Sequence, residues 1–376
     1  MSPVSTASTG QLSYASPPNS LPEDKEDNPS ESRARRLAEL KLIQNYVRNI
    51  SEPFYQATSN PLSLFASDNP LSTLWTTDVP ALGFENDNLL YAMHTLSTTH
   101  LLQSRPRNHK LVSTRQIYHS LALREQRKAV SGLASGSANA DAVCFASMLL
   151  SMDSYARLSE RTAGTPPSTS IYTPYAPPME WLHMSQGSGV LFRMTLLSIS
   201  STSAASTSSS TAKIALLLNS PPSLADHALY TPQNLAPYAA VLALPQPAYL
   251  EAPGLWDPEV RDAYERTLSL IGGMRLAIEA GEPIYAVGRR LMAFAMLVPK
   301  RFIELVEEMR PRALVILGLF FNVADQFRGV WWIGDASGRE GAGIRGVVGR
   351  EWKDVLERCC ISGGLVAGFP HMSSMM

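Results

Sequence analysis

The stretch Pro311-Arg-Ala-Leu-Val-Ile-Leu-Gly-Leu-Phe-Phe-Asn322 decides the fold class of this chain. It is a largely apolar segment of helical length, and it is followed by the Trp pair of Val330-Trp331-Trp332-Ile333-Gly334 and by Arg350-Glu351-Trp352. No stretch of the sequence alternates apolar and polar residues for long enough to indicate a strand. The sequence therefore predicts an all-α fold, whose last block holds helices over about 258–280, 283–297, 299–309, 311–328 and 349–358.

Helical periodicity also runs through the first half of the chain, where helices are predicted over about 32–49, 85–103, 110–133, 140–158 and 178–199. The first of these has one apolar stripe with spacings of three and four residues. The stripe consists of Leu37, Leu40, Ile43, Val47 and Ile50. Read as heptads it covers only two repeats, with Gln44 as a polar core position, whereas a sustained coiled coil needs about three or four. We therefore interpret it as the first helix of a globular domain rather than as a dimerising coil.

Composition divides the chain into a tail and one large domain. Residues 1–31 are rich in Ser, Pro and acidic side chains, so they cannot bury enough apolar surface to offset the entropy of ordering, and they are predicted to be disordered. Residues 32–370 are predicted to form an all-α regulatory domain. Within it, the Pro- and Ser/Thr-rich segments near 161–178 and 199–255 are predicted to be flexible insertions.

Charge and hydropathy exclude two classes of partner. The net charge of −1 gives no basic surface for binding nucleic acid along the whole chain. The longest apolar runs, Ala313–Phe321 and Leu291–Val298, are shorter than ten residues. Because a membrane-spanning helix needs about 20 apolar residues, the sequence predicts no membrane span and a soluble protein.

The residues that usually carry chemistry occur here without the necessary spacing. The three cysteines, Cys144, Cys359 and Cys360, cannot build a tetrahedral thiolate site by themselves. His94 and His100 are six residues apart, which puts them on different faces of a helix. The run Gly341-Ala-Gly343-Ile-Arg-Gly346 has the spacing of a dinucleotide motif but lacks the preceding strand. We therefore predict no catalytic, cofactor-binding or metal-ligating residues, and a protein that is not an enzyme.

The aromatic residues near the C-terminus are the remaining site candidates. Such side chains line apolar ligand pockets, although at helical spacing they more often form plain core. The ligand-pocket candidates are Phe320, Phe321, Trp331 and Trp332.

Several motifs resemble the regulatory region of fungal zinc-cluster (Zn2Cys6) transcription factors, in particular the sterol uptake control type. Arg310-Pro-Arg-Ala-Leu-Val-Ile-Leu317 is similar to the family's Arg-Pro-Arg-Ala-Leu-x-Ile-Leu run, and Trp331-Trp332 and Glu351-Trp352 follow in the expected order. Trp181-Leu182 resembles the start of the family's Trp-Leu-x-Leu-x-Arg-Gly helix, with Gln186 in place of the arginine. Weaker likenesses lie in Met93-His-Thr-Leu-Ser-Thr-Thr-His-Leu101 and Tyr118-His-Ser-Leu-Ala-Leu-Arg124, and together the motifs span about 60–360.

The resemblance implies a transcription regulator of a fungal gene set, either lipid- or sterol-responsive or belonging to a biosynthetic cluster of secondary metabolism. It also implies a nuclear protein, with shuttling from the cytoplasm left open. The family binds DNA through six clustered cysteines and this chain has three in all, so direct DNA binding by the chain is in doubt. The expected partner is a DNA-binding transcription factor, or a homo- or heterodimer partner. The alternative is a protein that binds an apolar, sterol-like small molecule and has no direct role in transcription.

Overall fold

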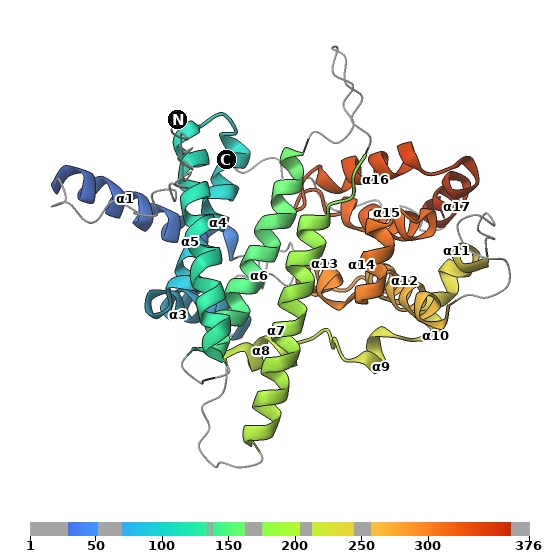
Figure 1. Ribbon diagram of the computed structural model, residues 1–376, viewed down its shortest axis with the longest axis horizontal. Coiled ribbons are helices and arrows are strands. Elements are labelled where there is room, and N and C mark those ends of the chain that lie inside the picture. Colours follow the sequence, from blue (N-terminus) through green and yellow to red (C-terminus); the bar gives the residue numbers. More distant parts are fainter. Residues whose placement is uncertain are drawn as a thin grey trace, which may run out of the picture. The chain divides into compact units, whose positions relative to one another are not determined.

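The computed structural model of the chain describes residues 29–51, 70–133, 135, 138–161, 175–203, 213–243 and 257–361. These ranges consist of helices and the turns that join them, with no strand among them (Figure 1). The predicted all-α fold is therefore confirmed. The predicted disordered tail lies almost wholly outside the described residues, as do large parts of the two predicted insertions.

The chain divides into two units, Met1–Lys41 and Leu42–Met376. The described part of the first unit is the beginning of α1 (Pro29–Asn45), where Arg35 Nε lies 3.1 Å from Glu39 Oε1. Leu37 and Leu40 of the apolar stripe are exposed here. In the second unit the stripe continues into η1 (Tyr46–Ile50), where Ile50 is buried.

The N-terminal half of the second unit is built around two helices that are buried over most of their length, α4 (Asp87–Ser104) and α6 (Ala140–Ala156). They pack against each other and against α5 (His109–Leu133). Short helices complete this half: α2 (Pro70–Thr73), η4 (Leu74–Asp78), α3 (Val79–Glu85) and η5 (Arg157–Glu160). Pro80 lies in the first turn of α3, where a missing backbone N–H costs no helical hydrogen bond.

A long helix, α7 (Met179–Ser203), connects the two halves, because it packs on α6 and on α13 (Ile284–Leu297) of the C-terminal half (Figure 1). Beyond it, residues 213–243 form short helices within the range predicted as a flexible insertion. They contribute the buried side chains of Ile214, Leu217, Tyr238 and Val241. These helices are α8 (Lys213–Asn219), α9 (Asp226–Leu229), α10 (Pro232–Leu235), η6 (Ala236–Tyr238) and α11 (Ala239–Ala243).

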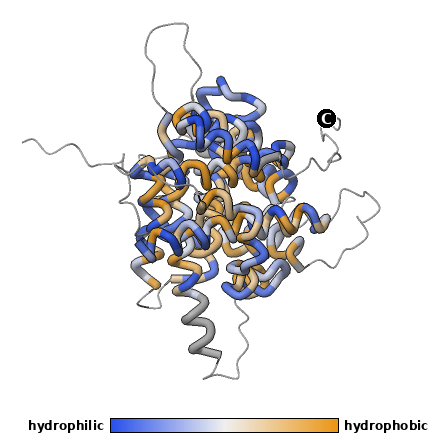
Figure 2. The backbone as a smooth tube through the Cα atoms, turned by 90° about the vertical axis from the view of Figure 1, so that its right-hand side faces the viewer, coloured by the Kyte–Doolittle hydropathy of each residue, from blue (hydrophilic) through white to orange (hydrophobic). Residues whose placement is uncertain are grey.

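The C-terminal half is a group of longer helices: α12 (Pro258–Glu279), α13 (Ile284–Leu297), α14 (Lys300–Glu307), α15 (Pro311–Asp325), α16 (Ala336–Val347) and α17 (Arg350–Ile361). At its centre lies α15, which contains the apolar run Ala313–Phe321 and packs against α12, α16 and α17. A side chain at Gly318 would come within 3.4 Å of Ile344 and Leu356, so this glycine lets α16 and α17 approach closely. Apolar segments run through the interior of the helical unit and hydrophilic ones along its rim (Figure 2).

The second arginine of the Arg-Pro-Arg motif, Arg312, joins several helices of the C-terminal half. Arg312 is buried, and its Nε donates a hydrogen bond to the Val241 carbonyl oxygen at 3.1 Å. Its guanidinium lies 5.4 Å from the ring centroid of Trp352 and 5.7 Å from that of Tyr264, which are cation–π distances. Arg312 therefore ties α15 to α11, α12 and α17.

The glycine run at 341–346 lies inside α16 and not in a phosphate-binding loop. A Cβ at Gly343 would come within 2.3 Å of the Tyr175 ring, so this glycine makes room for an aromatic side chain. No helix in the described ranges is both long and apolar enough to cross a lipid bilayer.

Candidate functional site

Three tryptophans of the motifs that carry the family resemblance, Trp181, Trp331 and Trp332, make contacts where the two halves of the second unit meet. We call this contact zone the junction. It consists of α4, α6, η5 and the start of α7 on one side, and of α15 and residues 331–340 on the other. Trp181, Trp331 and Trp332 all lie in it.

Three of the four predicted pocket residues belong to one aromatic cluster. Phe320 stacks on Phe294 with ring centroids 3.9 Å apart, and on Trp181 at 5.6 Å. The ring centroid of Phe321 lies 5.4 Å from that of Phe320 and 6.0 Å from that of Trp181. Tyr155 of α6 joins the cluster by edge contacts with Trp181 and Trp332. Aromatic pairs of this kind add about 0.5–1.5 kcal/mol each beyond their buried area.

The fourth residue, Trp331, faces another neighbour. Its ring packs edge-on against His100 of α4, with centroids 4.9 Å apart, and its carbonyl oxygen accepts a hydrogen bond from Gln103 Nε2 at 2.6 Å. Burial lowers the pKa of His100 below its ordinary value, which favours the neutral ring against the indole. Trp331 and Trp332 therefore hold different parts of the N-terminal half.

A small cavity adjoins Trp332, but Phe320 and Phe321 do not line it. Its free space is about 10 Å³, between methionines of α6 and α13 and the side chains of Trp181 and Ser185. This is room for about one water molecule, whereas pockets for drug-sized ligands measure about 300–1,000 Å³. A sterol-sized ligand would enter only if the lining side chains moved. The assignment of Phe320, Phe321, Trp331 and Trp332 as ligand-pocket residues stays a prediction.

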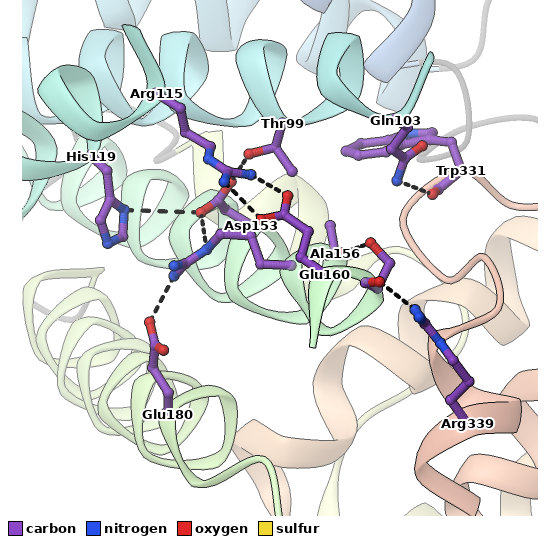
Figure 3. A network of polar contacts seen from close by, with 12 residues as sticks. Thr99, Gln103, Arg115, His119, Asp153, Ala156, Glu160, Glu180, Trp331 and Arg339 are labelled. Carbon is purple, nitrogen blue, oxygen red and sulfur yellow. Dashed lines mark hydrogen bonds and ion pairs between the residues drawn. The ribbon is translucent and has the colours of Figure 1, made fainter. Parts of the chain in front are cut away.

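Polar contacts within the N-terminal half, beside the junction, centre on Asp153, which is fully buried in α6. Thr99 Oγ1 donates a hydrogen bond to Asp153 Oδ1 at 2.5 Å, and Arg157 Nε lies 3.0 Å from Oδ2. His119 Nδ1 lies 3.9 Å from the same Oδ2. Burial lowers the pKa of His119, and the negative charge of Asp153 opposes that shift. Figure 3 shows Thr99 of α4 and His119 of α5 reaching Asp153, while Arg115 of α5 pairs with Glu160 of η5 beside it.

A second buried acid, Glu340 of α16, contacts both Arg161 and Tyr175. The Tyr175 hydroxyl donates a hydrogen bond to Glu340 Oε2 at 2.9 Å, and Arg161 Nη1 lies 3.1 Å from Oε1. Burial raises the pKa of Glu340, and the charge of Arg161 opposes the shift.

Two further bonds join α6 and η5 to α16. The hydroxyls of Tyr155 and Ser337 are 2.7 Å apart, and Arg339 donates to the carbonyl oxygen of Ser159. Together with the Glu340 contacts, these bonds form a polar part of the junction beside the apolar stacking of Phe320 and Trp181.

Sequence reasoning missed Asp153 and Glu340. A signal for Asp153 was available, because it is the only acidic residue between Ala142 and Ala156 in an otherwise apolar helix. A buried carboxylate in such a helix requires hydrogen-bonding or charged partners. Among the described residues, no group of three or more His, Cys, Asp or Glu side chains is placed to hold a metal ion. The contacts of the junction hold two helical halves together, and they offer a point where a change in one half alters the other.

No protein-family model matches the chain. Two curated proteins are similar to it over most of its length. A Zn(2)-C6 fungal-type transcription factor, afumD, of Aspergillus fumigatus is 28% identical over 291 residues, which cover 77% of this chain and 68% of the relative. A Zn(2)-C6 fungal-type transcription factor of Gibberella zeae is 23% identical over 316 residues, covering 82% of this chain and 58% of the relative. The chain thus spans about two thirds or less of these relatives, and its predicted resemblance to fungal zinc-cluster transcription factors is confirmed.

Proposed function

We propose that this chain regulates transcription of a fungal gene set from the nucleus and reaches its promoters through a DNA-binding partner. The observation that carries the proposal is the similarity to two Zn(2)-C6 fungal-type transcription factors over 77% and 82% of the chain. Two features of the given sequence support a partner: its three cysteines are too few for the six-cysteine cluster, and its net charge of −1 offers little attraction to phosphates. The partner is either a complete zinc-cluster factor or a second copy of the chain that associates with one.

The experiment is chromatin occupancy of the tagged full chain in its own cell, paired with a mobility-shift assay of the purified chain. Discrete promoter peaks together with no sequence-specific binding by the purified chain are the expected result. Co-purification from the same cells then identifies the DNA-binding partner. Specific binding by the purified chain alone would contradict the partner mechanism, and absence of peaks would contradict recruitment to promoters.

A matched pair of variants tests whether the junction takes part in this function. Trp331→Ala removes the contact with His100, whereas Phe84→Ala truncates an exposed aromatic side chain of α3. Transcript levels of the occupied genes are expected to change severalfold with Trp331→Ala and to stay unchanged with Phe84→Ala. Equal behaviour of both variants would remove the junction from the regulatory mechanism.

The second candidate function is an apolar small-molecule binding protein with no direct role in transcription. The small cavity beside Trp332 supports it, because methionines form much of its wall and unbranched, flexible side chains repack readily around a ligand. Ligand binding by a chain that produces no promoter peaks would favour this function. For the regulator, a lipid- or sterol-responsive gene set and a biosynthetic gene cluster are distinguished by which promoters carry the peaks.

A further inference from the structure

One face of α13 lines a second cavity, which shares Leu291, Met292 and Trp332 with the first. Tyr285, Gly288 and Met292 form one wall, and Phe327, Val330 and Trp332 form the other. The free space is about 20 Å³. Tyr285, Gly288 and Met292 are partly exposed, whereas Phe327 and Trp332 are buried, so the cavity has an outer mouth and an inner apolar end.

The cavity also contacts Arg289, a charged side chain that is only 5% exposed. Its guanidinium donates to the carbonyl oxygens of Leu217 and Pro221, each at 2.6 Å, and to that of Ser220. Arg290, the next residue, pairs with Glu282 at 3.1 Å or closer. Within the described ranges no carboxylate pairs with Arg289. Burial without a neutralising acid lowers the pKa of Arg289 to about 10.

The hydrogen-bonding capacity of Arg289 is not used up by these three carbonyls. A guanidinium has five N–H donors, and the bonds found here take two from Nη1 and one from Nη2. The remaining donors are Nε–H and one Nη2–H. The edge formed by Nε and Nη2 of a guanidinium is one that binds carboxylates in the bidentate manner.

Gly288 keeps the mouth of the cavity open. It lies in the interior of α13, where glycine is about 1 kcal/mol less favourable than alanine. A Cβ added there would meet nothing within 4 Å, so close packing does not require the glycine. Gly189 of α7 differs, since a Cβ there would come within 2.3 Å of the Met296 carbonyl oxygen. The open space beside Gly288 is therefore available to an apolar chain.

We propose that this cavity binds an apolar monocarboxylate, whose carboxylate pairs with the free edge of Arg289 and whose chain lies over Gly288 against Phe327 and Val330. The present free space holds about one water molecule, so the chain enters as Met292 turns aside. Met292 also lines the first cavity, and its unbranched side chain changes rotamer at low cost. This inference rests on the proposed function, since it names the ligand class to which the regulator, or the alternative binding protein, would respond.

The first cavity, which Met292 also lines, holds another polar group with unused hydrogen-bonding capacity. The Ser185 hydroxyl is buried in the wall of the first cavity, and it has no hydrogen-bond partner among the described residues. A ligand long enough to pass Met292 would bring its far end to Ser185. An acid with a hydroxyl or keto group at that end is therefore expected to bind more tightly than the simple acid.

The test is calorimetric titration of the purified full chain with decanoate, decanol and acetate. Decanoate is expected to bind at least tenfold more tightly than decanol, which lacks the charge, and than acetate, which lacks the chain. Equal affinity for decanoate and decanol would overturn the role of Arg289, and absence of decanoate binding would overturn the proposal.

Two variants place the ligand. Gly288→Leu fills the open space and retains the guanidinium, so decanoate affinity is expected to fall at least tenfold while the free chain keeps or gains thermal stability. Gly187→Leu is the matched control, because Gly187 is an exposed glycine inside α7 whose Cβ would also meet nothing within 4 Å. Unchanged decanoate affinity in Gly288→Leu would overturn the site.

Two measurements on the wild-type chain separate this inference from the proposed function. Promoter peaks of the wild-type chain test recruitment without any added ligand. If the wild-type chain gives peaks but does not bind decanoate, the regulator stands and the ligand site falls. If it binds decanoate but gives no peaks, the site stands and the regulator falls.

Discussion

The helices α15 and α6 are buried to a similar degree and are stabilised by different forces. The buried side chains of α15 are apolar apart from Arg312, and they are held by ring stacking and close packing. In α6 the apolar residues are joined by buried Asp153, Ser147, Ser151 and Ser154. An apolar helix tolerates small shifts, because dispersion and burial are not directional. A helix with a buried carboxylate has fixed neighbours, since a lost partner leaves a charge unpaired. We therefore infer that α15 supplies stability and α6 supplies specific contacts, through Asp153 within the N-terminal half and through Tyr155 across the junction.

The largest loss of stability is expected for Phe320→Ala. The substitution removes a ring that stacks on Phe294 at 3.9 Å and leaves a cavity at the centre of the C-terminal half. The free energy of unfolding in urea should fall by about 3–5 kcal/mol. Phe84→Ala, at a side chain that is 66% exposed, should change it by less than about 0.5 kcal/mol. Similar losses in the two variants would show that α15 is not the stabilising centre.

Asp153→Ala is expected to have the next largest effect, because it leaves Arg157 without its buried partner. Arg157 and His119 are partly exposed, so water compensates some of the loss, and we expect about 2 kcal/mol in urea unfolding. Asp153→Asn, which can still accept the Thr99 hydrogen bond, should lose less. The control is Asp262→Ala, which breaks an exposed ion pair with Arg266 and should cost less than about 1 kcal/mol. A loss in Asp153→Ala no greater than in this control would contradict the role assigned to α6.

Tyr175→Phe sharpens the comparison at the other buried acid. It removes the hydroxyl that donates to Glu340 at 2.9 Å and leaves the ring seated on Gly343. Loss of a hydrogen bond to a charged group should lower the free energy of unfolding by about 1–2 kcal/mol. Tyr230→Phe removes a longer bond, 3.4 Å to the Leu297 carbonyl oxygen, and should cost less. The opposite order would mean that Arg161 alone satisfies Glu340.

The smallest effect concerns pH and arises from His119 of α5, which lies 3.9 Å from Asp153 of α6, whereas α15 has no histidine. The folded pKa of His119 is below its unfolded value of 6.5, so the unfolded chain binds more protons between the two values. The contribution of His119 to stability is therefore fully present above pH 6.5 and is lost as pH falls through the folded pKa. Urea unfolding of His119→Gln should show a weaker loss of stability over this range than the wild-type chain. An identical pH dependence would contradict the lowered pKa.

The sequence allowed the long helices to be predicted because their signals are local. The expected helix at 311–328 is α15 from Pro311 to Asp325, and that at 140–158 is α6 from Ala140 to Ala156. The signals failed where local composition and tertiary packing disagree. The short helices between Lys213 and Ala243 were not predicted because this range contains several prolines. Helix α16 was not predicted because it is rich in glycine, and the need for Gly343 becomes clear only from its contact with the ring of Tyr175.

The site residues were harder to predict than the helices, because their partners are distant in sequence. Tyr175 and Glu340 are 165 residues apart, and Thr99 and Asp153 are 54 apart. Phe320, Phe321 and Trp332 were recognised as aromatic, and the structure brings them into one cluster with Tyr155 and Trp181. Arg289 gave no signal, since a buried charge cannot be distinguished from an exposed one by its neighbours in the chain.

The setting of Arg312 has a practical consequence for dividing this protein into fragments. Trp352 covers one face of its guanidinium, and it lies on α17, the last described helix. A shortened fragment that ends after α16 would lack Trp352, so water would reach the guanidinium of Arg312 at the centre of the C-terminal half. Reporter fusions and expression fragments should therefore retain the chain through Ile361, and a two-hybrid bait that stops before Arg350 is a poor choice.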